Sequence, residues 1–90
     1  MGRSIMNRDE ILAMVTRYIA ETAEEPITPA LDPAKSMKDY GLSSLDMVEV
    51  ISRSMRTLKV TVPRSELRGI RTIDGLVDLL HRAVAARAVD

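Results

Sequence analysis

The sequence predicts an all-α fold, a small bundle of three principal helices and one short helix. Hydrophobic residues make up 46% of the chain but aromatic residues only 2%, so aliphatic side chains must form most of the core. Apolar residues recur at three- and four-residue intervals in three segments, and prolines or glycines separate these segments. Because single domains usually hold about 100 to 150 residues, we expect residues 1–90 to form one domain, with residues 1–6 flexible and residues 86–90 most prone to fray.

The first helix is predicted near residues 8–23. Asn7 followed by Glu10 has the spacing of a capping box, in which two side chains satisfy the free N–H groups at a helix start. Pro26, Pro29 and Pro33 then prevent regular structure, so a long loop follows. The apolar helical stripe comprises Ile11, Leu12, Val15, Tyr18 and Ile19. The residues expected to anchor the loop are Ile27, Leu31, Met37 and Tyr40, followed by Gly41, which permits a tight turn.

The second helix is predicted from Ser44 to Leu58 and carries two apolar stripes. The stripe assigned to the core comprises Met47, Val50, Ile51, Ser54 and Leu58. The other comprises Leu45, Val48, Ser52 and Met55, and it lies roughly 80° to 160° further around the helix. A small bundle cannot easily bury both, so we expect something outside the chain to cover the second stripe. A solvated charged strip runs between them, in which the spacing of Glu49 and Arg53 favours an ion pair.

The last third of the chain is predicted to hold a connector, a helical turn and a final helix. The short segment 59–63 contains three β-branched residues in a row, but a lone strand has no partner in this chain, so we expect an extended connector. Residues 65–67 allow one helical turn that Gly69 ends. Thr72 is the expected cap of a helix whose apolar stripe comprises Ile73, Leu76, Val77 and Leu80. Residues 83–88 have helix propensity and either extend this helix or fray.

Composition and charge argue against several classes of function. The chain has no Cys and one His, His81, so a disulfide framework, a thiol nucleophile and most acid–base or metal chemistry are disfavoured. No apolar run has the length of a signal peptide or a membrane span, and we expect a soluble, cytoplasmic protein. The 13 basic and 13 acidic residues balance. Residues 1–50 nevertheless have a net charge of −4 and residues 51–90 a net charge of +4, which suggests oriented protein partners rather than nucleic acid.

The most informative segment is Asp39-Tyr-Gly-Leu-Ser-Ser-Leu-Asp46. Ser43 is placed to cap the second helix, with Asp46 completing a capping box, so that Ser44 becomes the first helical residue with an exposed hydroxyl. The first turn of a helix presents unpaired N–H groups and a partial positive charge. A phosphodiester bonded to Ser44 Oγ would therefore lie where an anion is favoured.

Here the sequence resembles the acyl carrier protein family, whose members carry a phosphopantetheine arm on the Ser of a Gly-x-Asp-Ser-Leu motif at the start of the second helix. The motif stands as Gly41-Leu-Ser-Ser-Leu45, and the resemblance covers nearly the whole chain. It implies a covalent 4′-phosphopantetheine, derived from coenzyme A, on Ser44. Ser43 stands where the family usually has Asp, and it keeps the capping function without the charge.

The resemblance implies a carrier without catalysis of its own, of the stand-alone polyketide or fatty-acid type. Because Arg53 and Arg56 follow Asp46 and Glu49 in the second helix, we expect partners that differ from those of a generic fatty-acid carrier, and polyketide biosynthesis is the preferred pathway class. Its expected partners are a phosphopantetheinyl transferase, an acyl-loading enzyme, and a ketosynthase or other acyl-processing enzymes. The expected carrier is a monomer with no nucleic-acid or membrane partner. Leu45, Val48 and Met55 would form the apolar patch that partners recognise, with Asp46 and Glu49 giving orientation. Ser54 would leave space in the core stripe for part of a cargo chain.

Two alternatives from other classes stay open on the sequence. One is a carrier-like helical scaffold that is never modified, because Ser43 replaces the usual Asp. The other is a helix-turn-helix DNA-binding domain, since Arg64, Arg68 and Arg71 lie in the basic second half. The net charge of zero and Glu49 in the best candidate recognition helix weigh against DNA binding.

Overall fold

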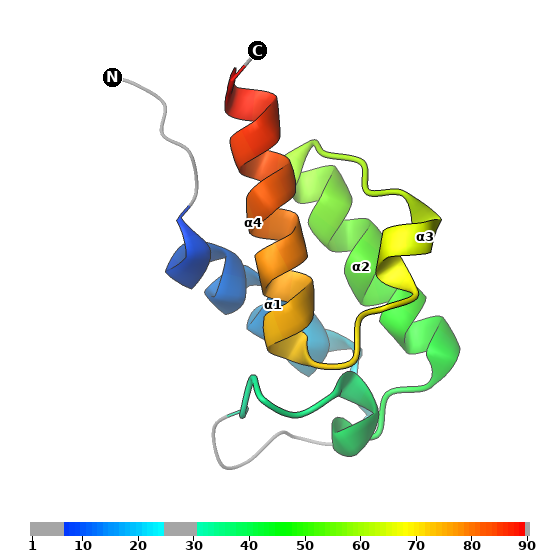
Figure 1. Cartoon of the computed structure of the whole chain (residues 1–90). Helices are drawn as coiled ribbons and strands as arrows, with labels where there is room; N and C mark the ends of the chain where they lie inside the picture. The colour runs from blue at the N-terminus through cyan, green and yellow to red at the C-terminus, as the bar shows by residue number, and fades with distance from the viewer. Residues whose placement is uncertain (1–6, 25–30, 90) are drawn as a thin grey trace.

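A computed structural model describes residues 7–24 and 31–89 of the chain, and these residues form helices and connecting loops. The elements are α1 (Arg8–Thr22), the 3₁₀-helix η1 (Met37–Tyr40), α2 (Ser44–Leu58), α3 (Arg64–Leu67) and α4 (Ile73–Val89). α1 packs against both α2 and α4. The connector after α2 leads to the short α3, which faces α2 (Figure 1). The prediction of three principal helices and one short helix is confirmed.

Local capping signals set the start of α1. The Glu10 N–H donates to Asn7 Oδ1 at 2.8 Å, and the Asn7 N–H donates to Glu10 Oε1 at 2.9 Å. This reciprocal pair is the predicted capping box, and it satisfies two of the N–H groups that a helix start leaves unpaired. The side chain of Arg8 then reaches α4, where its Nη2 donates to Asp74 Oδ1 at 2.8 Å and its Nε to Asp78 Oδ1 at 2.6 Å.

One aliphatic core lies between α1, α2 and α4. Both Met14 and Met37 are buried in it, in keeping with the adaptability of the methionine side chain. The only buried polar residue described is Ser54, whose hydroxyl donates to the Val50 carbonyl at 2.8 Å. The side chains with no exposed surface are Ile11, Val15, Ile19, Val50, Ser54, Ile73, Leu76, Val77 and Leu80.

The loop before α2 is anchored from both sides. Leu31 and Tyr40 pack against the core, and the Asp32 N–H donates to the Tyr40 hydroxyl at 2.6 Å. At the start of α4, the Ile73 and Asp74 N–H groups donate to the carbonyls of Lys35 and Pro33, each at 2.9 Å. These anchors confirm an ordered loop over the described part, whereas the predicted anchor Ile27 lies outside the described residues. The loop also contains η1, whose helical geometry was not predicted.

The charged strip on α2 differs from its prediction at Arg53. Its Nη2 donates to Glu21 Oε1 of α1 at 3.0 Å instead of pairing with Glu49. Its guanidinium carbon also lies 4.3 Å from the centroid of the Tyr18 ring. A partner on another helix and an aromatic face together hold this cation more firmly than an exposed neighbour one turn away.

The second half of the chain follows its predicted order. Lys59, the first residue of the predicted extended connector, instead ends α2 in the left-handed conformation with φ 58°, and residues 60–63 lead into α3 without regular structure. α4 begins after Thr72, whose Oγ1 accepts from the Gly75 N–H at 3.0 Å. The structure contains, within its described residues, no helix long and apolar enough to cross a membrane.

Candidate functional site: the start of α2

A left-handed glycine leads the chain into α2. Gly41 has φ +85°, a conformation that residues with a Cβ rarely adopt, and its N–H donates to the Lys38 carbonyl at 3.0 Å. The next residue, Leu42, is buried with 3% of its surface exposed. The turn is therefore fixed by a conformational choice at Gly41 and by an apolar anchor at Leu42.

Ser43 and Asp46 form the predicted capping box at this helix start. The Asp46 N–H donates to Ser43 Oγ at 3.1 Å, and the Ser43 N–H donates to Asp46 Oδ2 at 3.0 Å. The hydroxyl of Ser43 is thus engaged in the cap. Ser44 becomes the first residue of α2 and is exposed, as predicted. Its Oγ lies at the positive end of a helix of 15 residues, where a phosphate diester is electrostatically favoured.

The predicted recognition residues occupy three different environments. Leu45 and Val48 keep 78% and 58% of their surface exposed, and Glu49 is also exposed. Asp46 is half-buried because its carboxylate belongs to the cap. Met55 is half-buried against the edge of the core. The second stripe of α2 is therefore open to solvent at its first half and partly covered further along.

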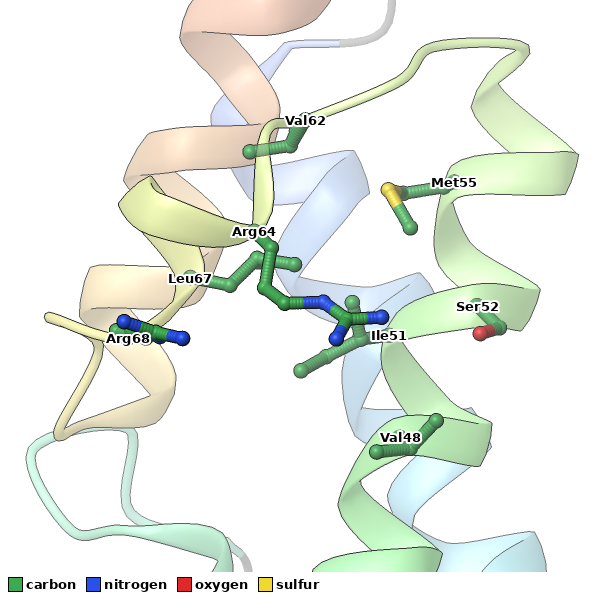
Figure 2. A pocket seen from close by; sticks show the side chains of 8 residues that line it. All are labelled: Val48, Ile51, Ser52, Met55, Val62, Arg64, Leu67 and Arg68. Carbon is green, nitrogen blue, oxygen red and sulfur yellow. The ribbon is translucent and has the colours of Figure 1, made fainter.

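Val48, Ser52 and Met55 of this stripe also line a cavity between α2 and α3, which Figure 2 shows. Its volume is about 580 Å³, within the range of small-molecule sites. The cavity was not predicted, because its far wall comes from α3, whose position follows from tertiary packing. Its lining residues are Val48, Ile51, Ser52, Met55, Val62, Arg64, Leu67 and Arg68.

Ser54 does not line this cavity. It faces the closed core, and its hydroxyl bonds to the Val50 carbonyl one turn back. Because Ser54 is completely buried, the predicted cargo space is not found there.

The described residues contain no cluster of side chains that could hold a metal ion. Within residues 7–24 and 31–89, no three His, Cys, Asp or Glu side chains lie close enough together to hold a metal ion. The imidazole of His81 is on α4 and half-exposed. The features that do converge at the start of α2 are an exposed hydroxyl, a helix N-terminus and adjacent exposed apolar side chains.

Known proteins are similar to this chain over most of its length. The family model described as "Phosphopantetheine attachment site" matches residues 11–80. An acyl carrier protein of Saccharopolyspora erythraea is 32% identical over 89 residues, covering 94% of each chain. The polyketide biosynthesis acyl-carrier-protein AcpK of Bacillus subtilis is 27% identical over 79 residues, covering 88% of this chain and 96% of its own.

A solved structure agrees with the sequence relatives. In the crystal structure of the Curacin biosynthetic pathway HMG synthase in complex with acetyl donor-ACP, a chain superposes with a TM-score of 0.76 at 32% identity, covering 86% of this chain and 99% of that one. None of these relatives is named as a DNA-binding protein, so the comparisons give no support to the helix-turn-helix alternative. Ser44 is exposed at the capped start of α2, with exposed apolar side chains beside it, and the relatives match the chain along nearly its full length. The chain therefore belongs to the acyl carrier protein family, whose domain is the attachment site of phosphopantetheine.

Proposed function

We propose that this chain carries acyl intermediates as thioesters on a phosphopantetheine arm bonded to Ser44 Oγ. The assignment rests on one observation, which is that the two adjacent serines have different environments. Ser43 Oγ accepts the Asp46 N–H in the cap, whereas Ser44 is exposed at the first position of α2. Attachment at Ser44 therefore leaves the helix start intact, while attachment at Ser43 would disrupt it.

The residues around Ser44 suit this modification. In the transfer, the Oγ–H bond of Ser44 breaks and Oγ bonds to the phosphorus of the pantetheine phosphate. The bond from that phosphorus to the adenosine bisphosphate part of coenzyme A breaks, and the serine proton passes to a base of the transferase. The resulting diester lies at the N-terminus of α2, whose dipole favours the anion.

Once attached, the arm supplies a terminal thiol, and the tether raises the concentration of the bound acyl group at each partner enzyme. The chain itself provides no catalytic group in this proposal. We assign recognition by partners to the exposed side chains of Leu45 and Val48, with Met55 further along the same stripe. Glu49 gives a negative charge for orientation, and Asp46 contributes through the cap that positions Ser44.

The proposed pathway class is polyketide biosynthesis. The Bacillus subtilis carrier to which this chain is similar is named for polyketide biosynthesis, and the similar solved chain comes from a complex of the Curacin biosynthetic pathway. The charges on α2 support specialised partners, since two basic residues, Arg53 and Arg56, follow the acidic Asp46 and Glu49 on the same helix.

Mass spectrometry tests the attachment site directly. The protein is incubated with coenzyme A and a broad-specificity phosphopantetheinyl transferase, and the intact mass is measured, with fragmentation to locate the added group. A single phosphopantetheine on Ser44, absent from Ser44→Ala, is the expected result. No addition, with the native pathway's transferase also tested, would leave the unmodified scaffold as the better interpretation.

A further inference from the structure

The cavity between α2 and α3 adjoins the face of α2 that bears Ser44. At 100° per residue, Val48, Ile51 and Met55 lie within about 40° of Ser44 around the helix axis. With a rise of 1.5 Å per residue, Ile51 lies about 10 Å along the axis from Ser44. A chain tethered to Ser44 that folds back along α2 therefore reaches this cavity.

The walls of the cavity suit a short aliphatic chain. Val48, Ile51 and Met55 line it from α2, and Val62 and Leu67 line it from the connector and α3. Val62 is buried and Leu67 packs against the core, so this wall is held in place. Methylene groups that enter the cavity would exchange water for these side chains, which is favourable by about 25 cal/mol for each Å² of apolar surface buried.

Two arginines give the cavity a positive rim. In Figure 2 the Arg64 guanidinium extends across the opening toward Ile51 and Ser52 of α2, and Arg68 lies beside Leu67. None of the eight described lining residues is acidic. The ion pairs formed among the described residues involve other arginines, Arg8 and Arg53. Two cations next to an apolar concavity that has no carboxylate in its lining favour a ligand that has an aliphatic part and an anionic end.

We propose that this cavity selects acyl groups that end in a carboxylate, with Arg64 and Arg68 binding that carboxylate and the apolar walls holding the methylenes. The inference rests on the proposed attachment at Ser44. The phosphate of the arm is a less suitable anion, because it is bonded at the start of α2, whereas Arg64 reaches the helix near Ile51, about 10 Å further along. Guanidinium groups can bind a carboxylate through two parallel hydrogen bonds, which a neutral acyl end cannot offer.

Matched acyl groups test this specificity. The ¹⁵N-labelled protein is loaded on Ser44 with an arm carrying glutaryl or pentanoyl, two five-carbon groups of which only glutaryl ends in a carboxylate. Each acyl group is joined to the arm by an amide instead of a thioester to prevent hydrolysis. We expect glutaryl alone to move the Arg64 and Arg68 Nε–H signals, and its methylenes to show nuclear Overhauser effects to the methyl groups of Val48 and Leu67.

The variant Arg64→Gln/Arg68→Gln should reduce the glutaryl-dependent shifts of the Val48 and Leu67 signals by about threefold or more, since one or two partly exposed ion pairs are lost. Arg71→Gln is the matched control, because Arg71 is an exposed arginine that does not line this cavity, and it should retain the shifts. Circular dichroism of both variants establishes that the helices are intact. Retained shifts in a folded double variant would overturn the proposal.

Three further outcomes would also overturn the proposed specificity. Equal shifts with glutaryl and pentanoyl would mean that the cavity holds aliphatic chains regardless of charge. Shifts of the arginine signals with the unacylated arm would assign these residues to the phosphate. If protein that is loaded by mass shows no acyl-dependent shift, Arg64 and Arg68 would be assigned to binding an acidic protein partner instead. Failure to load Ser44 at all is distinguished by the mass measurement, and it would overturn the proposed function and this inference together.

Discussion

Arg53 of α2 lies over the ring of Tyr18 of α1, with its guanidinium carbon 4.3 Å from the ring centroid. The same guanidinium donates to Glu21 Oε1 at 3.0 Å, and the Tyr18 hydroxyl lies 2.7 Å from Thr57 Oγ1 of α2. These contacts form a polar seam between α1 and α2 at the border of the aliphatic core. The seam joins the helix that carries Ser44 to the first helix of the bundle.

Removal of the cation should loosen this seam. Arg53→Gln is expected to lower the free energy of unfolding by about 0.5 to 1 kcal/mol, because both the ring contact and the ion pair are partly exposed. Urea denaturation followed by circular dichroism measures the change. Arg56→Gln, an exposed arginine on the same helix, should change stability by less than about 0.5 kcal/mol. Equal decreases in the free energy of unfolding of the two variants would mean that the Arg53 contacts do not stabilise the fold.

The two serines at the start of α2 should separate stability from loading. Ser43→Ala is expected to lower the free energy of unfolding by about 1 kcal/mol, because the Asp46 N–H loses its acceptor. Ser44→Ala should keep wild-type stability and lose the phosphopantetheine group. Melting curves and intact masses of both variants check this division. Loading of Ser44→Ala to the wild-type extent would move the site to Ser43.

A methyl group at Gly41 should strain the turn before Ser44. Gly41→Ala is expected to cost about 1 kcal/mol, because φ is +85° there. No heavy atom lies within 4 Å of the added Cβ, so the cost arises from backbone conformation and not from a clash. Gly69→Ala is the matched control, since its Cβ would meet only the Glu66 carbonyl oxygen at 3.9 Å, an ordinary contact. Denaturation of Gly69→Ala should show no comparable loss.

The exposed stripe should matter for partners and not for folding. Leu45→Ala is expected to change stability by less than about 0.5 kcal/mol, because 78% of this side chain is already exposed. Its affinity for a transferase or a ketosynthase should fall by roughly fivefold or more if Leu45 anchors the interface. Titration calorimetry measures the affinity, with Thr61→Ala as an exposed control on the connector. Unchanged binding of Leu45→Ala would move the interface elsewhere.

Acid should weaken the link between α1 and α4. The hydrogen bond from Arg8 lowers the pKa of Asp78, and the nearby positive charges of Arg8, Arg82 and His81 act in the same direction. Because the pKa is lower in the folded state, this carboxylate stabilises the protein above its unfolded pKa, near 3.9, and the contribution is lost as the pH falls through the lowered folded value.

The melting temperature measured from neutral pH downward should therefore fall more in the wild type than in Asp78→Asn, which lacks the titrating group. Glu24→Gln, an exposed residue just beyond α1, should follow the wild-type curve. Parallel curves for wild type and Asp78→Asn would contradict a stabilising role for this ion pair. Added salt should reduce the difference, since the pair is exposed to solvent.

The features that the sequence predicted well are local. Capping boxes such as Asn7–Glu10 and Ser43–Asp46 involve residues three apart, and both form as expected. The exposure of Leu45 and Val48 follows from the two apolar stripes on one helix, because a bundle of this size buries one of them. The placement of Ser44 at the first helical position needed nothing beyond this local geometry.

The features that the sequence predicted poorly depend on how helices meet. Glu49 is one turn from Arg53 in sequence, but the packing of α1 brings Glu21 to the guanidinium instead. The space assigned to Ser54 is closed, since this residue is completely buried, and a cavity opens instead where α3 faces Met55. Spacing along one helix contains no information about either arrangement.

The two hydrogen bonds from the start of α4 to the loop carbonyls of Pro33 and Lys35 have a consequence for how the protein is made. Residues 73 and 74 must leave the ribosome before the segment that leads into the serine turn has its fixing partners. A nascent chain that has not yet reached residues 73 and 74 would expose the Gly41–Leu45 motif while the loop before it lacks these two hydrogen bonds. A transferase that recognises the folded turn would then modify Ser44 only after the start of α4 has packed against the loop.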